Sequence, residues 1–204
     1  MPAKPAATAK RRTAEKRDRR RREVIAAAEA VFAEKGFHEA TTREIGERIG
    51  LLPGSLYYYV PSKEAALAEV CRKQGAEFNA RLTAVLESER PIVAKIRAGM
   101  MLHIMHNRSY LAATFTFARR DLPEAVLPAL KALAEEYHRL WDEMFRRAAA
   151  RGELPAGFDV QAATIGLLAL CNGSLHWYEG KPASEVEAIA LRLVNQFLKG
   201  VLSA

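Results

Sequence analysis

Apolar residues recur at helical spacing in the first part of the chain. From Thr13 onward they fall on one face of a helix, and Gly36 is placed to end that helix as a C-cap. The residues of this apolar face are Val24, Ala27, Ala28, Val31 and Phe32. Residues 1–12 mix Pro, Ala and Lys without an apolar period, so we expect them to form a disordered basic arm.

Two short helices are predicted next, on either side of Gly50. The first begins at a segment, Thr41-Thr42-Arg43-Glu44, that offers a hydroxyl cap and an acidic first turn. The second begins with Pro53, which suits a first helical turn, and continues through Tyr59. A glycine between the two helices permits a positive backbone angle that other residues resist.

The rest of the chain is also predicted to be helical and is interrupted only where Pro or Gly falls. The expected helices run from Ser62 toward Glu87, from Pro91 to Asn107, over 109–120, from Pro123 to Gly152, over 159–178 and over 184–200. No β-type alternation, repeat or Gly-rich phosphate loop occurs, so the sequence predicts an all-α fold. We expect an N-terminal three-helix domain over residues 13–62 and a larger helical domain over 63–204.

Positive charge is concentrated at the N-terminus. The net charge of the chain is +7, and residues 1–60 hold 13 Lys and Arg against 8 Asp and Glu, a surplus of five. Nine cations lie within the thirteen positions from Lys10 to Arg22. This density indicates a polyanionic partner, with phosphate or minor-groove contacts, although a solubilising tail is the simpler alternative.

Cysteine usage and hydropathy indicate a cytoplasmic protein. Cys71 and Cys171 stand far apart without a CxxC spacing, which favours two buried thiols in a reducing compartment over a disulfide or a zinc knuckle. No apolar run approaches the ~20 residues that a membrane-spanning helix needs. We therefore expect no membrane partner.

The two short helices around Gly50 predict a helix-turn-helix that binds duplex DNA. The first helix can lie against the sugar-phosphate backbone while the second enters the major groove, which admits one helix. Tyr57, Tyr58 and Tyr59 offer hydroxyls to phosphate oxygens and flat faces to thymine methyl groups. The alternative is a helical hairpin in which Gly and Pro only end the helices.

The segment TTREIGERIGLLPGSLYYYVPSKEAAL resembles the N-terminal domain of the TetR family of bacterial repressors, and the resemblance extends over about Arg19 to Val70. It implies that Thr42 is the backbone-contacting cap and that Arg43 reaches phosphate or a base edge. It implies DNA contacts for Ser55, Tyr57, Tyr58 and Lys63, with Lys63 as a phosphate anchor, and packing roles for Ile45, Ile49, Leu56 and Tyr59. One position departs from the family, because Leu52 stands where it usually has a capping Ser or Thr.

A helix-turn-helix needs a second copy to read an operator, because two recognition helices are presented about one DNA turn, ~34 Å, apart. The two apolar helices predicted over 159–178 and 184–200 are the expected homodimer interface, as they are in the family. The alternative is that these helices only form the monomer core.

A small-molecule effector site is predicted in the middle helices, where polar and aromatic residues interrupt an apolar surface. A short segment from Cys171 to Ala190 resembles the acyl-CoA-responsive branch of the family, with matches at Asn172, Trp177 and Tyr178. The predicted ligand-binding residues are Met100, His103, Asn107, Phe115, Arg119, Asn172 and Trp177.

The sequence therefore predicts a dimeric repressor of palindromic operator DNA that an acyl-CoA thioester releases. A lipophilic drug as effector, with an efflux pump as the regulated gene, is the alternative. No catalytic constellation is legible, so we expect no enzyme, and we expect no cofactor or metal, although His103 and His106 share helical spacing. A nucleoid-type DNA packager is a further alternative, which would bind without sequence preference.

Overall fold

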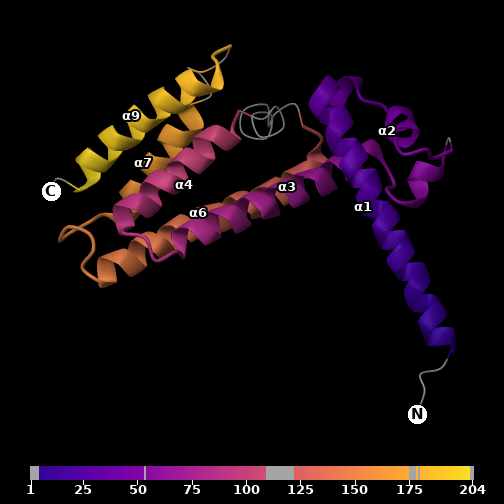
Figure 1. Ribbon diagram of the computed structural model, residues 1–204, viewed down its shortest axis with the longest axis horizontal. Helices are drawn as coiled ribbons and strands as arrows, with labels where there is room; N and C mark the ends of the chain where they lie inside the picture. Colours follow the sequence, from indigo (N-terminus) through magenta and orange to yellow (C-terminus); the bar gives the residue numbers. More distant parts are fainter. Residues whose placement is uncertain (1–4, 53, 109–121, 175–177, 179, 203–204) are drawn as a thin grey trace. The chain divides into compact units, whose positions relative to one another are not determined.

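The computed structural model describes residues 5–52, 54–108, 122–174, 178 and 180–202 (Figure 1). All regular elements in these ranges are helical, as predicted. The elements are α1 (Pro5–Glu39), α2 (Thr42–Arg48), η1 (Ser55–Tyr58), α3 (Lys63–Leu86), α4 (Ile92–His106), η3 (Glu124–Val126), α6 (Leu127–Ala150), α7 (Val160–Gly173) and α9 (Ala183–Leu202), of which η1 and η3 are 3₁₀ helices. The predicted helix over 109–120 lies outside the described residues.

The chain forms two compact units. The first consists of residues 1–74 with 123–129, and the second of residues 75–122 with 130–204. The sequence placed the domain boundary at the start of α3, but the division falls inside this helix. The reason is that the first turns of α3 pack with α1. Glu29 of α1 receives hydrogen bonds from Lys73 at 2.7 Å and from Gln74 at 3.0 Å.

Helix α1 begins at Pro5, so the expected disordered arm is wrong for residues 5–12, which are helical. Pro is tolerated in a first helical turn, and Ala, Lys, Arg and Glu have high helix propensity. Ion pairs one turn apart support the helix: Arg11 with Glu15 at 3.3 Å and Arg19 with Glu23 at 3.7 Å. Gly36, the predicted helix end, interrupts α1 with a positive φ of 77°, and a further helical turn continues to Glu39.

Helix α2 is capped by Thr41, not by Thr42, which is its first residue. Thr41 Oγ1 accepts a hydrogen bond from the Glu44 backbone N–H at 3.2 Å, and Glu44 Oε2 accepts one from the Thr41 backbone N–H at 3.0 Å. This reciprocal capping box requires a spacing of three residues. The hydrogen bonds that Glu44 accepts from Lys35 and from Thr41 lower the pKa of its carboxyl to about 2.

The second short element of the helix-turn-helix is the 3₁₀ helix η1 and not the α-helix that the sequence predicted. Gly54 precedes it with φ of 82°, a conformation that favours glycine, and supplies no side-chain cap. Leu56 of η1 is buried, as predicted. It belongs to a small core of the first unit that also contains Val24, Ala28, Val31, Phe32, Ile45, Val60, Leu67 and Val70.

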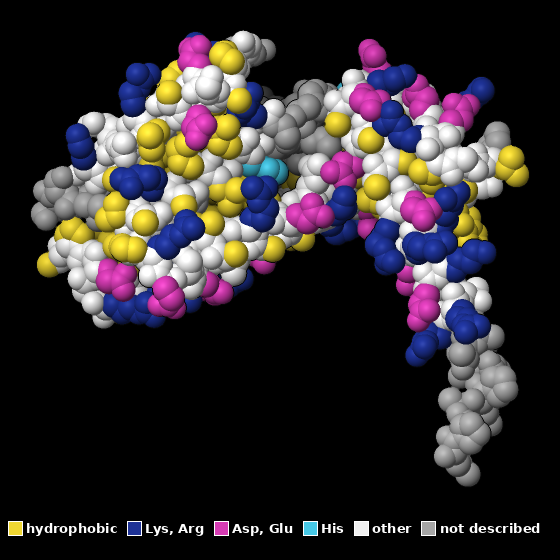
Figure 2. Space-filling view, in the orientation of Figure 1, with side chains coloured by type: hydrophobic (Ala, Val, Ile, Leu, Met, Phe, Trp, Pro, Cys, Tyr) yellow, Lys and Arg dark blue, Asp and Glu magenta, His cyan; other side chains and the backbone are white. Residues whose placement is uncertain are grey.

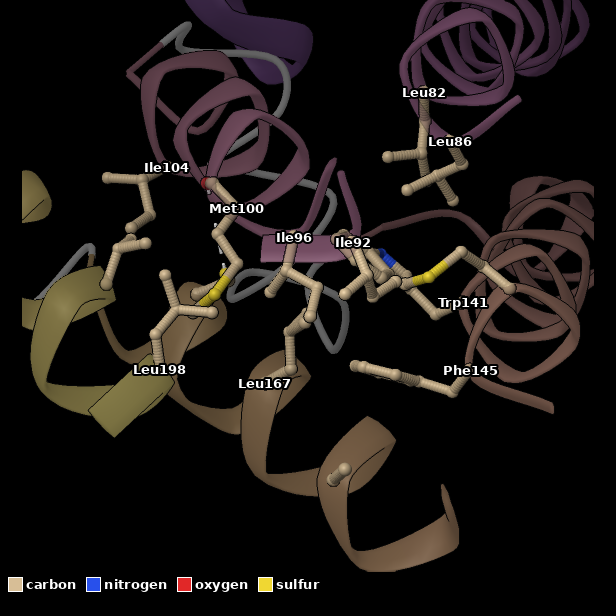
Figure 3. Close-up of a cluster of buried hydrophobic side chains, with 14 of the residues drawn as sticks. Leu82, Leu86, Ile92, Ile96, Met100, Ile104, Trp141, Phe145, Leu167 and Leu198 are labelled. Atoms are coloured by element: carbon tan, nitrogen blue, oxygen red, sulfur yellow. Dashed lines mark hydrogen bonds between the residues drawn. The ribbon is translucent and has the colours of Figure 1, made fainter. Parts of the chain in front are cut away.

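Helix α4 lies at the centre of the second unit and packs against α7 and α9. The unit's core also includes residues of α3 and α6 (Figure 3). Trp141 and Phe145 of α6 stack with ring centroids 6.0 Å apart, and both are fully buried. Within the described ranges, no helix is long and apolar enough to cross a membrane.

Candidate nucleic-acid interface and effector region

Large apolar side chains are exposed on the helix-turn-helix. Leu52 is 76% exposed, Tyr58 72% and Tyr57 54%. Only two other large hydrophobic residues within the described ranges are exposed, Ile165 and Leu191 of the second unit. Exposed aromatic and aliphatic groups concentrated on one short segment mark an interaction surface.

The exposed tyrosines are held by neighbouring side chains. The hydroxyl of Tyr57 lies 3.3 Å from Thr42 Oγ1, which links η1 to the first turn of α2. The ring of Tyr58 packs edge-on against Tyr59, with centroids 5.1 Å apart and an interplanar angle of 88°. Tyr59 is half-buried, in keeping with its predicted packing role. The two exposed tyrosines are therefore presented from a fixed base.

The other predicted DNA-binding residues have different surroundings. Arg43 is highly exposed, and its Nε donates to Glu47 Oε1 at 2.7 Å. Glu47 is exposed as well, so the predicted phosphate contact would require the exchange of this one ion pair. Ser55, the first residue of η1, is half-buried. Thr42, Arg43 and Tyr57 are thus brought together at the α2–η1 junction.

Lys63 lies elsewhere, at the end of α1. Its Nζ donates to the backbone carbonyl oxygens of Phe37 at 2.8 Å, His38 at 3.2 Å and Ala40 at 3.0 Å, and lies 4.4 Å from the centroid of the Phe37 ring. An ammonium group has three N–H donors, so all three are engaged within the first unit. The geometry favours a role in holding the α1–α2 connection over the predicted phosphate contact.

A basic groove lies between α1 and the tyrosines. It has a volume of about 360 Å³ and is lined by Thr13, Lys16, Arg17, Arg19, Arg20, Glu23, Tyr58 and Tyr59. Arg20 is committed, because it pairs with Glu23 at 2.5 Å and donates to the Ile49 carbonyl at 2.8 Å. Lys16 and Arg17 are exposed, and neither forms an ion pair with a residue that the structure describes. Figure 2 shows the Lys and Arg side chains that gather over α1.

A buried polar network occupies the second unit. The Tyr137 hydroxyl on α6 lies 2.6 Å from His103 Nδ1 on α4, and His103 Nε2 lies 3.1 Å from Asn172 Oδ1 on α7. Because the Asn172 oxygen only accepts, Nε2 carries the proton and Nδ1 accepts from the tyrosine. Burial, aided by nearby His106, lowers the pKa of His103 to about 4, so its ring is neutral near pH 7.

Aromatic rings extend this network. The ring of Phe78 on α3 stacks on His106 at 4.3 Å between centroids and on Tyr137 at 5.4 Å. Burial lowers the pKa of His106, and Arg81 lowers it further. Sequence reasoning missed Phe78 and Tyr137. The signal for Tyr137 was its place four residues before Trp141 on one face of an amphipathic helix, where a buried tyrosine needs a partner for its hydroxyl.

The predicted effector residues fall into three groups. His103 and Asn172 are joined in the polar network. Met100 is fully buried in the core, and Asn107 is buried with its Nδ2 donating to the Cys171 carbonyl at 3.2 Å. Phe115, Arg119 and Trp177 lie outside the described residues. Two cavities of the second unit lie elsewhere: one of about 170 Å³ includes Lys95 and Arg147, and one of about 310 Å³ includes Phe158 and Phe197.

Helix α7 presents an uncharged surface. It contains no Lys, Arg, Asp or Glu, and its exposed residues are Gln161, Ala162, Ile165 and Ala169. Ile165 is 53% exposed, and Leu191 of α9 is 43% exposed. A solvent-facing helix usually carries charge, so this surface is suited to contact with another protein surface.

The described parts of the chain hold no group of three or more His, Cys, Asp or Glu residues that could bind a metal ion. Both cysteines are buried and free. Burial raises the pKa of Cys71 to about 12 and raises that of Cys171 as well, so both remain neutral thiols.

Comparison with known proteins places both units in one family. The model described as bacterial regulatory proteins, tetR family, matches residues 24–70. The model described as tetracyclin repressor-like, C-terminal domain, matches residues 89–201, more than half of the chain.

Individual relatives are distant and similar over most of their length. The transcriptional repressor KstR2 of Rhodococcus jostii is 23% identical over 198 residues, which cover 90% of this chain and 92% of that protein. The fatty acid metabolism regulator protein of Bacillus subtilis is 22% identical over 143 residues, covering 69% and 74%. The structure of FadR from Bacillus subtilis in complex with stearoyl-CoA has a TM-score of 0.73 at 19% identity and covers 88% of this chain and 98% of that one.

Proposed function

This chain belongs to the TetR family of transcriptional repressors, and we propose that it binds palindromic operator DNA as a homodimer and is released by an acyl-CoA thioester. The observation that carries the proposal is the exposure of Tyr57 and Tyr58 beside a basic groove. Each half of the proposed mechanism rests on its own set of contacts.

The DNA-binding half is supported by surfaces that are complementary to a duplex. Tyr57 and Tyr58 carry hydroxyls for phosphate oxygens and rings for base edges. Lys16 and Arg17 line the same groove as Tyr58 and have no carboxylate partner among the described side chains, so they are available to a DNA phosphate. Thr42 and Arg43 add contacts from the first turn of α2.

The dimer is supported by the uncharged face of α7 and by Leu191 on α9. In an isologous interface the same patch occurs on both copies, so Ile165 and Leu191 of each copy face the other. Burying these exposed apolar side chains favours association. Two copies then present their η1 segments to successive major grooves.

The effector half is supported by the network of His103, Tyr137 and Asn172. Buried polar groups are costly unless they are hydrogen-bonded, so their presence beneath an otherwise apolar core indicates a site that recognises polar ligand atoms. The FadR structure contains stearoyl-CoA, which supplies the ligand class for this proposal. Phe115, Arg119 and Trp177 are proposed to line the same site on the family resemblance alone.

Release of DNA requires that the effector binds one dimer conformation more tightly than another. A tenfold loss of operator affinity corresponds to ~1.4 kcal/mol of coupling free energy. An effector that hydrogen-bonds to His103 Nε2 has to replace the existing bond to Asn172. We propose that this exchange shifts α4 relative to α7 and changes the spacing of the two helix-turn-helix segments.

The test is a gel shift on an operator selected from random duplex DNA. Stearoyl-CoA and shorter acyl-CoAs are compared with free CoA, free fatty acid and the lipophilic cation tetraphenylphosphonium. We expect acyl-CoAs to dissolve the complex. Release by the cation alone would replace the acyl-CoA proposal with the drug-responsive alternative, and binding without sequence preference would favour a DNA packager.

A pair of variants tests whether the network responds to the effector. We expect Asn172→Ala to reduce the response to acyl-CoA while operator binding persists. Glu135→Ala, at an exposed position of α6 outside the proposed dimer surface, should leave the response unchanged. Equal responses in the two variants would remove Asn172 from the effector site.

A further inference from the structure

Leu52 combines an exposed side chain with a fixed backbone. It is the most exposed large hydrophobic residue of the described chain. Its carbonyl oxygen accepts a hydrogen bond from the Ser55 N–H at 3.0 Å, and the preceding Leu51 N–H donates to the Gly46 carbonyl at 2.9 Å. Hydrogen bonds therefore hold the backbone at Leu51 and Leu52, while the Leu52 side chain is exposed to solvent.

Leu52 neither caps the recognition helix nor packs in the core. A side chain at this position in the family is usually a hydroxyl that caps the recognition helix, but a leucine has no atom that can accept a hydrogen bond. The residue before η1 is instead Gly54, without a side-chain cap. Leu52 also contributes little to the core, which contains Leu56 and Val60 from the same segment.

Among the base edges of the major groove, one group is chemically matched to a leucine side chain. Phosphates and the polar base edges require donors or acceptors, which a leucine lacks. The major groove displays a single apolar feature, the C5-methyl group of thymine. Leu52 lies three residues before Ser55, the first residue of η1. Tyr57 and Tyr58 of η1 are exposed as well, and η1 is the element proposed to face DNA.

We propose that Leu52 is a specificity-determining residue that packs against a thymine methyl group in each operator half-site. This inference rests on the proposed DNA-binding function and adds a readout at one base position. The loss of the cap is then offset by an apolar contact that favours an A·T pair there. A 5-methylcytosine at the same position satisfies the contact equally, because it presents the same methyl group.

The experiment is a thymine-to-uracil scan of an operator selected from random duplex DNA by the full-length protein. Uracil keeps the base pair and removes only the methyl group. Affinity is measured for the wild-type protein, Leu52→Ala and Leu52→Ser on each uracil-substituted operator. Both changes occur at an exposed position, so circular dichroism should show the same helix content and thermal transition for all three proteins.

We expect one thymine per half-site at which uracil weakens wild-type binding about fourfold, the factor that burial of one methyl group provides. At that thymine, Leu52→Ala and Leu52→Ser should bind both operators equally. Tyr58→Phe is the matched control, because it keeps the ring and should retain the preference for thymine. Equal thymine preferences in wild type and Leu52→Ala at every position would overturn the inference.

The failure of this inference is distinguishable from that of the proposed function. If the wild-type protein selects a specific operator but shows no Leu52-dependent methyl preference, only the leucine readout is wrong. If no operator is selected from the random pool, sequence-specific binding fails, and the readout fails with it.

Discussion

The two units hold their candidate functional side chains in opposite ways. In the first unit Leu52, Tyr57 and Tyr58 extend into solvent, whereas in the second unit His103 and Tyr137 are buried and hydrogen-bonded to each other. An exposed and braced surface suits the proposed contact with DNA, because it needs no rearrangement. A buried network binds a ligand only by exchanging its internal hydrogen bonds, which suits a switch between two states.

The first test concerns the proposed homodimer and uses a substitution that should separate its two copies. We expect Ile165→Glu to weaken operator affinity by at least about a hundredfold, because a carboxylate at the α7 face is buried without a partner on association. Sedimentation equilibrium and fluorescence anisotropy with labelled operator measure the two effects. Ala134→Glu, at an exposed position of α6, is the control. A dimeric Ile165→Glu protein would place the interface elsewhere.

Acidification tests the buried network. The pKa of His103 falls from 6.5 in the unfolded chain to about 4 in the folded protein, so between these values the unfolded chain binds the extra proton. The free energy of unfolding should therefore decrease as the pH falls from 6.5 to 4, by up to about 3 kcal/mol. Urea titrations across this range measure it. His103→Gln should reduce this slope, and an unchanged slope contradicts the burial of a neutral histidine.

A substitution of Lys63 tests whether this cation stabilises the first unit or contacts DNA. We expect Lys63→Met to lower the free energy of unfolding by about 2 kcal/mol, because three carbonyl groups lose a charged donor. The salt dependence of operator binding should stay the same. A variant with wild-type stability and a smaller salt slope would restore the phosphate contact that the family resemblance implies.

The cations of the basic groove should affect DNA binding and not stability, which is the reverse of the result expected for Lys63. Replacing Lys16 and Arg17 together by Ala should reduce operator affinity about tenfold at physiological salt and lower the slope of log affinity against log salt by about two. Stability should change little, since both side chains are exposed. The paired control is Lys131→Ala with Arg139→Ala on α6. Equal slopes for the two double variants would exclude the groove from DNA binding.

Local signals in the sequence predicted most helix ends. Ser62 acts as expected, since its Oγ accepts from the Ala65 N–H at 3.0 Å, and Gly36 interrupts α1 three residues before the helix ends at Glu39. The N-cap of α2 was harder to assign, because the adjacent threonines at 41 and 42 both fit and only the reciprocal bond with Glu44 selects the first. The helix start at Pro5 was missed because apolar periodicity is absent from a helix that ion pairs and propensity support.

The candidate sites were predictable only where they lie close together in the sequence. Thr42, Tyr57 and Tyr58 belong to one short motif, and the family resemblance predicted a DNA contact for all three. The partners of His103 could not be inferred, because Tyr137 and Asn172 come from helices 34 and 69 residues away. The role of Lys63 was obscured for the same reason, since its partners are backbone carbonyls that carry no residue signature.

The most direct test of a DNA-binding surface coupled to a buried switch is reciprocal binding. Isothermal titration of stearoyl-CoA is carried out with the free dimer and with the dimer saturated by its selected operator. If the effector weakens operator binding by a given factor, thermodynamic linkage requires the operator to weaken effector binding by the same factor. We predict at least a tenfold difference between the two titrations, which corresponds to ~1.4 kcal/mol. Equal affinities for stearoyl-CoA in the two titrations would contradict the account.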